Sequence, residues 1–354
     1  MKKLAVLILA TLLSLPISGL AGDAPIAVST PEDLMAIADN PTASYILTDD
    51  IDMEGVAWKP IEFYGTLDGA GHTIYNLHIV QVGDKKGRTR DGNLKKYDTY
   101  FASLFSVVRD AEIKDLHLLN LCIDVTADGF NCFAAGIAGL AEYTTITGCS
   151  VTGRITLYQN YYMCGVAGIA GSGSGTIANC SADVELVIVD TNRSLKCEEF
   201  LGGIAGAGYF DIENCTVKLD GYASVHGYVH NGGVLGMYKI YMSDERDHKG
   251  YVRGCTVDAR ITFFEHNSDR RAYCKDIIGE KLNKYLQPEN NTVLSFESTE
   301  TRDYKTVLLP PTCAEGSYTV TVVPPTATAF GYTLYTCPES GYSYTDHYVR
   351  PTAP

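Results

Sequence analysis

Short segments in which apolar and polar residues alternate make up most of this chain, and glycine interrupts them every few residues. The segment "TIANCSADVELVIV", which begins at Thr176, keeps this alternation except for a slip of one residue near Asn179. The apolar positions that we expect to face inward are Ile177, Cys180, Val184, Leu186 and Ile188. A period of two in β-branched segments predicts β-strands and argues against helical repeats.

Two short motifs recur along the chain. The first occurs as "TIYNLHI", "EIKDLHL", "TITGCSV", "TIANCSA", "DIENCTV" and "YVRGCTV", beginning at Thr73, Glu112, Thr145, Thr176, Asp211 and Tyr251. The second, "GIAG" and its variants, begins at Ser103, Gly136, Gly168, Gly203, Gly233 and Asp276. Four cysteines of the first motif, at 149, 180, 215 and 255, are 31, 35 and 40 residues apart. Such a period indicates a solenoid, and strand-like repeats predict a right-handed parallel β-helix of about six coils.

The repeat also predicts corners and a side that carries long loops. Asn76, Asn179 and Asn214 recur at one corner, where their side chains can satisfy the backbone groups of a turn. The glycines of "GIAG" suit a tight corner where bulk would clash. In most coils we expect a turn of about six residues between the "GIAG" strand and the next strand, with a longer connection only between Gly236 and Tyr251, whereas the other connection varies throughout. Insertions therefore gather on one side, which in repeat proteins is often the binding face.

Other structure is expected to close both ends of the repeat. Thr30 is a preferred N-cap residue, Pro31 suits the first helical position, and an acidic first turn follows, so we expect a capping helix over 31–38. The repeat fades near Asn290. The expected organisation is a signal peptide over 1–21, a β-helix over 22–295 and a C-terminal accessory β module over 296–354.

The first residues indicate export. Residues 1–21 join a basic start to an apolar run and end in small residues, which is typical of a secretory signal peptide. The apolar run is too short for a membrane span, and no later stretch reaches the roughly 20 apolar residues that a spanning helix needs. We therefore expect a secreted or surface-associated protein that does not insert into the membrane.

The charge of the chain argues against a nucleic-acid partner. The formal net charge is -14 and the isoelectric point is about 5.0, whereas phosphate binding needs clustered basic residues. One segment, 85–96, is basic, with only Asp91 opposing Lys85, Lys86, Arg88, Arg90, Lys95 and Lys96. This segment is either a solvated loop or a contact for an acidic partner such as an acidic glycan.

The chain has 11 cysteines, an odd number. The four cysteines of the first motif occupy equivalent positions, so we expect a buried column of free thiols rather than a disulfide framework. Cys132 and Cys164 are also equivalent to each other. Because neighbouring coils lie within disulfide range, this pair is the first to test for a bridge.

Candidate acids occur in two turns near the N-terminus. Asp68 lies beside glycine in a turn that favours aspartate for backbone reasons, and catalysis is the alternative. Asp49, Asp50 and Asp52 offer oxygen ligands for calcium, although three acids before a strand also suit a solvated turn. We expect no other metal and no cofactor.

The insertion after Gly236 contains the densest ionisable cluster, made of Asp244, Glu245, Arg246, Asp247 and His248. Paired carboxylates there could act as acid and base in glycoside cleavage, and an exposed charged loop is the alternative. His226 and His230 lie in a variable loop but lack the third and fourth ligands that a zinc site needs.

Aromatic residues give the strongest binding signal. Those in or beside the variable connections are Tyr97, Tyr100, Phe130, Tyr158, Tyr161, Tyr162, Tyr222 and Tyr228. Exposed tyrosines on stacked coils would present rings suited to sugar faces, and the alternative is that they cover the core under long loops. The ligand-binding candidates are Tyr158, Tyr161, Tyr162, Tyr222 and Tyr228.

Residues 63–79, "FYGTLDGAGHTIYNLHI", together with the "GIAG" elements, resemble the bacterial secreted and surface β-helix proteins that carry GLUG repeats. The matching positions are Phe63, Gly65, Thr66, Leu67, Asp68, Gly69, Gly71, His72, Thr73, Ile74, Asn76 and Leu77, with Ala70 in place of the usual asparagine. The resemblance covers roughly residues 28–290. It implies the architecture and supplies no catalytic residues.

Residues 310–320 and 331–349 resemble small tyrosine-rich β modules of exported proteins from Gram-positive bacteria, in which Cys313 could pair with Cys337. Together with the repeat, this predicts a monomeric, adhesin-like protein that binds glycans or host and matrix surfaces. A polysaccharide lyase or glycoside hydrolase acting on the outer face of the β-helix is the first alternative. A structural spacer is the second.

Overall fold

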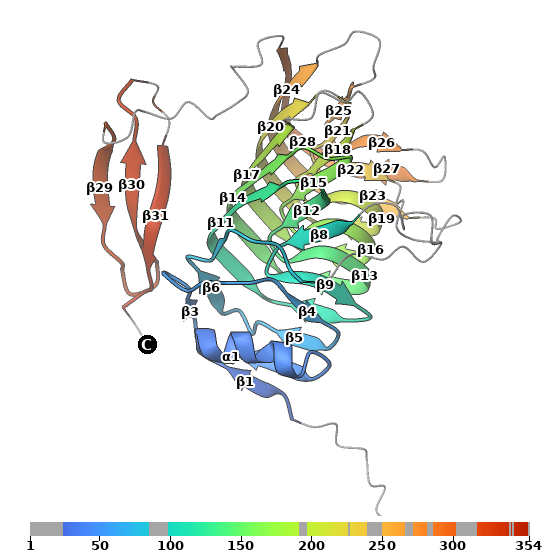
Figure 1. The fold of residues 1–354 in the computed structure, drawn as a ribbon. Coiled ribbons are helices and arrows are strands. Elements are labelled where there is room, and N and C mark those ends of the chain that lie inside the picture. Colours follow the sequence, from blue (N-terminus) through green and yellow to red (C-terminus); the bar gives the residue numbers. More distant parts are fainter. Residues whose placement is uncertain are drawn as a thin grey trace, which may run out of the picture.

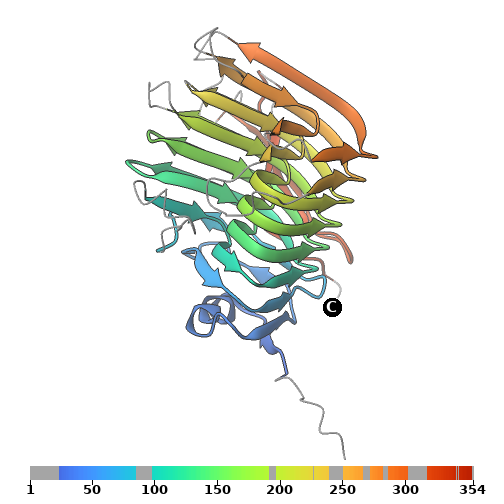
Figure 2. The ribbon, with the colours of Figure 1, turned by 90° about the vertical axis from the view of Figure 1, so that its right-hand side faces the viewer.

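The computed structural model describes residues 24–84, 98–190, 197–225, 227–238, 250–265, 272–281, 286–301, 317–339, 341 and 343–352. Three parallel sheets, here called A, B and C, run along one stack of coils, and a small antiparallel sheet lies beside it (Figure 1). Turned by 90° about the vertical axis, the molecule shows its coils stacked in sequence order (Figure 2). The predicted parallel β-helix is confirmed.

Sheet A holds the "GIAG" segments and the first half of the other motif. Its main path contains β1 (Ile26–Val28), β2 (Ser44–Leu47), β5 (Thr66–Asp68), β10 (Glu112–Lys114), β13 (Ala138–Thr147), β16 (Ala170–Ala178), β19 (Ala205–Glu213), β22 (Leu235–Tyr238) and β26 (Ile278–Lys281). The strands beside this path are β4 (Ile61–Phe63), β9 (Phe105–Arg109), β23 (Tyr251–Arg253) and β27 (Gln287–Glu289).

Sheets B and C complete each coil. Sheet B contains β3 (Ile51–Asp52), β6 (Thr73–Tyr75), β7 (His78–Ile79), β11 (His117–Ala127), β14 (Ser150–Gln159), β17 (Ser181–Asp190), β20 (Thr216–Val225), β24 (Thr256–Glu265) and β28 (Thr292–Thr301). Sheet C contains β8 (Thr99–Ala102), β12 (Asn131–Ala135), β15 (Met163–Ala167), β18 (Glu198–Gly202), β21 (Tyr228–Gly232) and β25 (Ala272–Lys275). Sheet B therefore continues to Thr301, six residues beyond the predicted end of the β-helix at residue 295.

The N-terminal cap forms as the sequence predicts. Helix α1 (Pro31–Ala36) continues into a 3₁₀ turn, η1 (Ile37–Asp39). Thr30 and Asp33 form a capping box, and Leu34 and Ile37 are fully buried. The exchange of hydrogen bonds at the cap satisfies backbone N–H groups that a helix start otherwise leaves unpaired.

The repeat places equivalent side chains in register. Ile146, Ile177 and Ile212 follow one another across neighbouring strands of sheet A, and all three are fully buried. The predicted inward residues of β17 are buried as well. Stacking identical side chains gives every coil the same packing, so the core continues from coil to coil.

The predicted cysteine column is present. Cys149, Cys180, Cys215 and Cys255 are at most 2% exposed and carry free thiols. The Cys180 thiol is 3.3 Å from the Ala178 carbonyl oxygen, and hydrogen bonding between neighbouring thiols together with burial raises the pKa of Cys215 to about 12. The Cys215 thiol therefore stays neutral, and all four buried side chains act as packing groups.

The bridge considered for Cys132 and Cys164 does not form. The two residues are direct partners between β12 and β15, and both are buried with free thiols. Burial raises the pKa of Cys132 to about 12, which disfavours the thiolate that disulfide formation needs.

Two details of the expected repeat geometry are wrong. No separate turn joins the "GIAG" segment to the following motif, because both lie on one strand in β13, β16 and β19. In β16 the bend is made at Gly173 and Gly175, which have φ of +140° and +131° and approach the backbone of the preceding coil too closely for a side chain. A strand that bends at glycine replaces the expected turn.

The first coil also aligns differently. The segment "EIKDLHL" begins on β10 of sheet A, and its partner in the first coil is β5. The segment "TIYNLHI" instead begins on β6 of sheet B, where Thr73 pairs with His117 of β11. The turn at 69–72 causes this shift. Asn76 consequently lies at a different corner from Asn179 and Asn214, although all three adopt left-handed conformations.

The C-terminal module is an antiparallel sheet in the order β29 (Thr319–Val323), β30 (Gly331–Thr336) and β31 (Ser343–Val349). It lies beside sheet B, with β31 nearest to the stack (Figure 1). Cys337 is buried and disulfide-bonded. Its expected partner, Cys313, lies outside the described residues.

Candidate functional site

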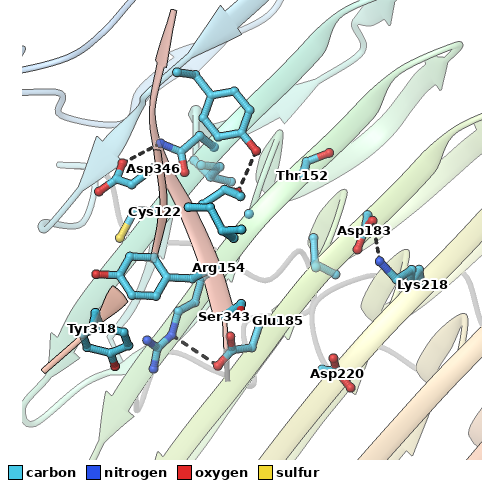
Figure 3. A pocket seen from close by; sticks show the side chains of 18 residues that line it. Cys122, Thr152, Arg154, Asp183, Glu185, Lys218, Asp220, Tyr318, Ser343 and Asp346 are labelled. Atoms are coloured by element: carbon cyan, nitrogen blue, oxygen red, sulfur yellow. Dashed lines mark hydrogen bonds and ion pairs between the residues drawn. The ribbon is translucent and has the colours of Figure 1, made fainter. Parts of the chain in front are cut away.

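A cleft of about 650 Å³ lies between the outer face of sheet B and the C-terminal module (Figure 3). Sheet B and its corner contribute Asn120, Leu121, Cys122, Thr152, Gly153, Arg154, Asp183, Val184, Glu185, Lys218 and Asp220. The module contributes Tyr318, Leu334, Ser343, Tyr344, Thr345, Asp346 and Tyr348.

The strand alternation of sheet B sets the polar wall of the cleft. Asp183 and Glu185 point outward because Val184 and Leu186 on either side are buried. Register then aligns Thr152, Asp183 and Lys218 in one column. A second column consists of Arg154, Glu185 and Asp220. The coil repeat thus brings charged residues about 30 positions apart in sequence onto one surface.

Carboxylates outnumber cations on this wall. Lys218 Nζ lies 3.0 Å from Asp183 Oδ2, and Arg154 Nε lies 3.5 Å from Glu185 Oε1 (Figure 3). The hydrogen bond from Lys218 to Asp183 raises the pKa of that lysine, so it stays charged. Both lining cations are already paired, Asp220 pairs with Arg260 just outside the lining, and Asp346 of the module adds a further carboxylate. An acidic ligand would meet repulsion here.

Tyrosine rings supply the opposite wall. Tyr318 and Tyr344 line the cleft and meet edge to face at 5.5 Å, and Tyr344 also stacks at 4.9 Å on Tyr335, which is not part of the lining. The Tyr348 and Thr345 hydroxyl oxygens are 2.7 Å apart, and burial raises the pKa of Tyr348. These side chains offer flat apolar faces beside neutral hydroxyl groups, which suits a sugar ring.

Asparagine side chains fix the module to the stack. Asn76 Nδ2 donates to the Tyr348 carbonyl oxygen at 3.1 Å, and the Tyr348 N–H donates back to Asn76 Oδ1 at 3.2 Å. Asn120 Nδ2 donates to Asp346 Oδ1 at 2.9 Å and to Asn76 Oδ1 at 3.0 Å. Net contributions of about 0.5–1.5 kcal/mol per hydrogen bond make this a modest but specific contact.

Further contacts of the module with the stack are one ring pair and two exposed ion pairs at the rim. The rings of Tyr75 and Phe330 meet edge to face at 5.2 Å. Arg350 approaches Asp49 at 3.2 Å, and His347 approaches Glu54 at 3.2 Å, with all four side chains more than half exposed. Exposed ion pairs contribute about 0–1 kcal/mol each, so the asparagine bonds and the ring contact dominate.

The predicted tyrosine candidates do not line this cleft. Tyr158 and Tyr222 lie half-buried on sheet B, Tyr161 and Tyr162 lie on the turn before β15, and Tyr228 is 38% exposed at the start of β21. Tyr162 packs against the core. The five residues therefore do not form one continuous exposed row.

The N-terminal acids serve the backbone and neighbouring cations. Asp50 accepts from the Thr73 N–H and Asp52 from the Glu54 N–H. Asp68 accepts from Ala70 and pairs with Lys114 at 3.0 Å, and these contacts outweigh partial burial and lower its pKa. Within the described residues, no group of three or more acidic, histidine or cysteine side chains is arranged to hold a metal.

Several predicted features lie outside the described residues. These are the signal peptide over 1–21, the basic segment over 85–96, His226, and the cluster of Asp244, Glu245, Asp247 and His248. His230 is described and is buried, with Nδ1 2.8 Å from Glu280 Oε2 and its ring stacked on Phe200 and Tyr273.

The charged wall of the cleft was not predicted, although its residues leave a signal in the sequence. Each "C-S/T-V/A" segment is followed by polar residues at the next two outward positions, as in Asp183 and Glu185 or Lys218 and Asp220. The module's contribution had no comparable signal, because nothing in the repeat indicates where a separate sheet will dock.

Comparison with known proteins identifies no family: no protein-family model matches the chain, and no curated protein matches it significantly. Among the described residues, the only helices are too short to cross a bilayer.

Proposed function

We propose that this protein binds uncharged or amino-bearing glycans in the cleft between sheet B and the C-terminal module, and that it does so as an adhesin-like protein at or outside the cell surface. The observation that supports this most directly is that a wall of tyrosine rings faces a polar, hydrogen-bonding wall in a cleft of about 650 Å³. Sites for small ligands combine apolar faces with a few placed polar groups in this way.

The charge of the cleft defines the ligand class within this proposal. Both lining cations are held by carboxylates, Asp220 is held by Arg260 outside the lining, and Asp346 is a further acid on the lining. Uronic acid or sulfate groups would have to displace an existing ion pair, whereas hydroxyl and ammonium groups can bond to carboxylates directly. The resemblance to GLUG-repeat proteins and the signal-like start of the chain favour an extracellular role.

The enzyme alternative has less support in this cleft. A glycosidase needs one carboxyl group that keeps its proton, which an apolar setting or a like charge provides. Asp183 instead pairs with Lys218, Glu185 with Arg154 and Asp220 with Arg260, so these carboxylates lie beside cations and not in an apolar setting.

A glycan array with reducing-end detection tests the proposal. The full chain should bind neutral or amino-bearing glycans and should ignore acidic ones, with no new reducing ends. Preferential binding of acidic glycans would contradict the cleft assignment and favour the basic segment over 85–96. Release of reducing ends would establish cleavage in place of simple binding.

A further inference from the structure

The contact between Asn76 and β31 imitates a β-bridge. A side-chain amide carries the same donor and acceptor as a peptide unit, and Asn76 uses both against the N–H and carbonyl of a single residue, Tyr348. β31 is the edge strand of its sheet. Asn76 thus occupies the place of a neighbouring strand for one residue of that edge.

The stack holds this amide ready for the contact. Asn76 and Asn120 have φ of +59° and +56°, a left-handed conformation that asparagine tolerates better than most residues. Asn76 is 8% exposed and also donates to Asp52 Oδ1 at 2.9 Å. The bond from Asn120 to Asn76 links the two corners of neighbouring coils, so the pair presents one preformed surface to β31.

We infer that Asn76 and Asn120 are positioning residues that hold the module over sheet B, and that ligand binding and module docking strengthen each other. Each wall of the cleft belongs to a different partner in this docking, so the cleft is complete only when the module is docked. A ligand that touches both walls binds the docked state more tightly, and by linkage it must stabilise docking by the same factor. Only the ligand part of this inference rests on the proposed function.

Docking is tested first without ligand, by hydrogen exchange on the full chain. The Tyr348 N–H is the reporter because it donates to Asn76. Asn76→Gly combined with Asn120→Gly removes both amides while keeping residues that accept positive φ. Asn179→Gly is the matched control, since Asn179 has φ of +55° and lies at an exposed corner of sheet A.

We expect exchange at Tyr348 to accelerate by about tenfold or more in the double variant and to be unchanged in the control. Both variants should fold, and the unfolding midpoint of the double variant should lie only slightly below that of the control, because the double variant also loses the bonds of Asn76 to Asp52 and Asn120. Unchanged exchange at Tyr348 in a folded double variant would overturn the positioning role.

The coupling is then tested with a neutral glycan that the array identifies. Saturating glycan should slow exchange at Tyr348 in the wild-type chain, and the double variant should bind it about tenfold more weakly, with the control unaffected. Equal affinity in the undocked double variant would overturn the coupling. If no glycan binds the wild-type chain, the proposed function fails, whereas the docking role is decided by the exchange experiment alone.

Discussion

The stack of coils and the C-terminal module are held by different kinds of contact. In the stack, one contact is repeated, as where Ile146, Ile177 and Ile212 occupy the same position in successive coils. The module instead meets the stack through contacts that occur once, between residues 226 to 301 positions apart, such as Asn120 with Asp346 and Asp49 with Arg350. Repetition secures the fold, and a few single polar bonds complete the cleft.

This difference predicts that substitutions in the two regions will have distinct effects on stability and on docking of the module. Core substitutions should lower the stability of the whole β-helix, because every coil supports the next. Substitutions at the docking contact should change the module and leave the stack intact. The following predictions are ordered from the largest expected effect to the smallest.

Ile177→Ala should give the largest loss of stability. Ile177 is fully buried in the repeated column, and truncation leaves a cavity between coils, so we expect the free energy of unfolding to fall by about 2–5 kcal/mol in urea titrations. The neighbouring Thr176→Ala, which removes a partly exposed side chain, should change it by about 0.5 kcal/mol or less. Similar losses for both would contradict the column as the source of stability.

Cys180→Ser should cost about 1–3 kcal/mol, because it buries a hydroxyl in a site built for a thiol. The wild-type cysteine column should also resist thiol reagents in the native state and react once urea unfolds the chain. Rapid labelling of native Cys180 would show that the column is open to solvent.

Alkaline pH should weaken the fold through its buried thiols. Burial raises the pKa of Cys132 from 9.0 to about 12, so the folded state holds this proton more tightly than the unfolded state. Stability should be level below pH 9 and fall between pH 9 and 12, by about 1.4 kcal/mol per pH unit for one such thiol. Unfolding measured across this range should show a shallower fall for Cys132→Ala, and an unchanged slope would assign the effect elsewhere.

Arg350→Ala should have the smallest effect. Its ion pair with Asp49 is exposed, so the unfolding free energy of the β-helix should not change measurably and docking should weaken by about 1 kcal/mol or less. Exchange at the Tyr348 N–H should accelerate only severalfold, and raising the salt concentration should reduce the difference from wild type. A loss of docking as large as that of the asparagine pair would place the main contact at the rim.

Much of the stack could be predicted from sequence because its physics repeats. Alternation placed Ile177 and Leu186 inside, equivalence placed Cys180 in a column, and the N-cap Thr30 followed by Pro31 placed the first helix. The first coil was aligned wrongly with the later coils, because the turn at 69–72 moves its motif to the next strand while the amino-acid pattern of the motif stays the same.

The cleft could not be predicted in the same way. The charged outward positions of sheet B can be recognised in the sequence, but their partner surface depends on where the module docks. That contact relies on Asn76 and Asn120, which appear in the sequence as ordinary corner residues. Contacts that occur only once leave no periodic pattern in the sequence. The tyrosines of the variable loops do stand out in the sequence, so the sequence pointed to them as the binding site in place of the cleft.

The affinity of two variants for one neutral glycan tests the central proposal most directly. Tyr344→Ala with Lys218→Ala alters both walls of the cleft, whereas Tyr158→Ala with Tyr161→Ala and Tyr162→Ala removes rings outside it. With both variants folded, titration calorimetry should show binding weakened at least about fivefold by the cleft pair, since an aromatic contact contributes about 1 kcal/mol. The loop variant should bind like wild type. Loss of binding in the loop variant alone would contradict the account and return the site to the tyrosines beside the variable connections.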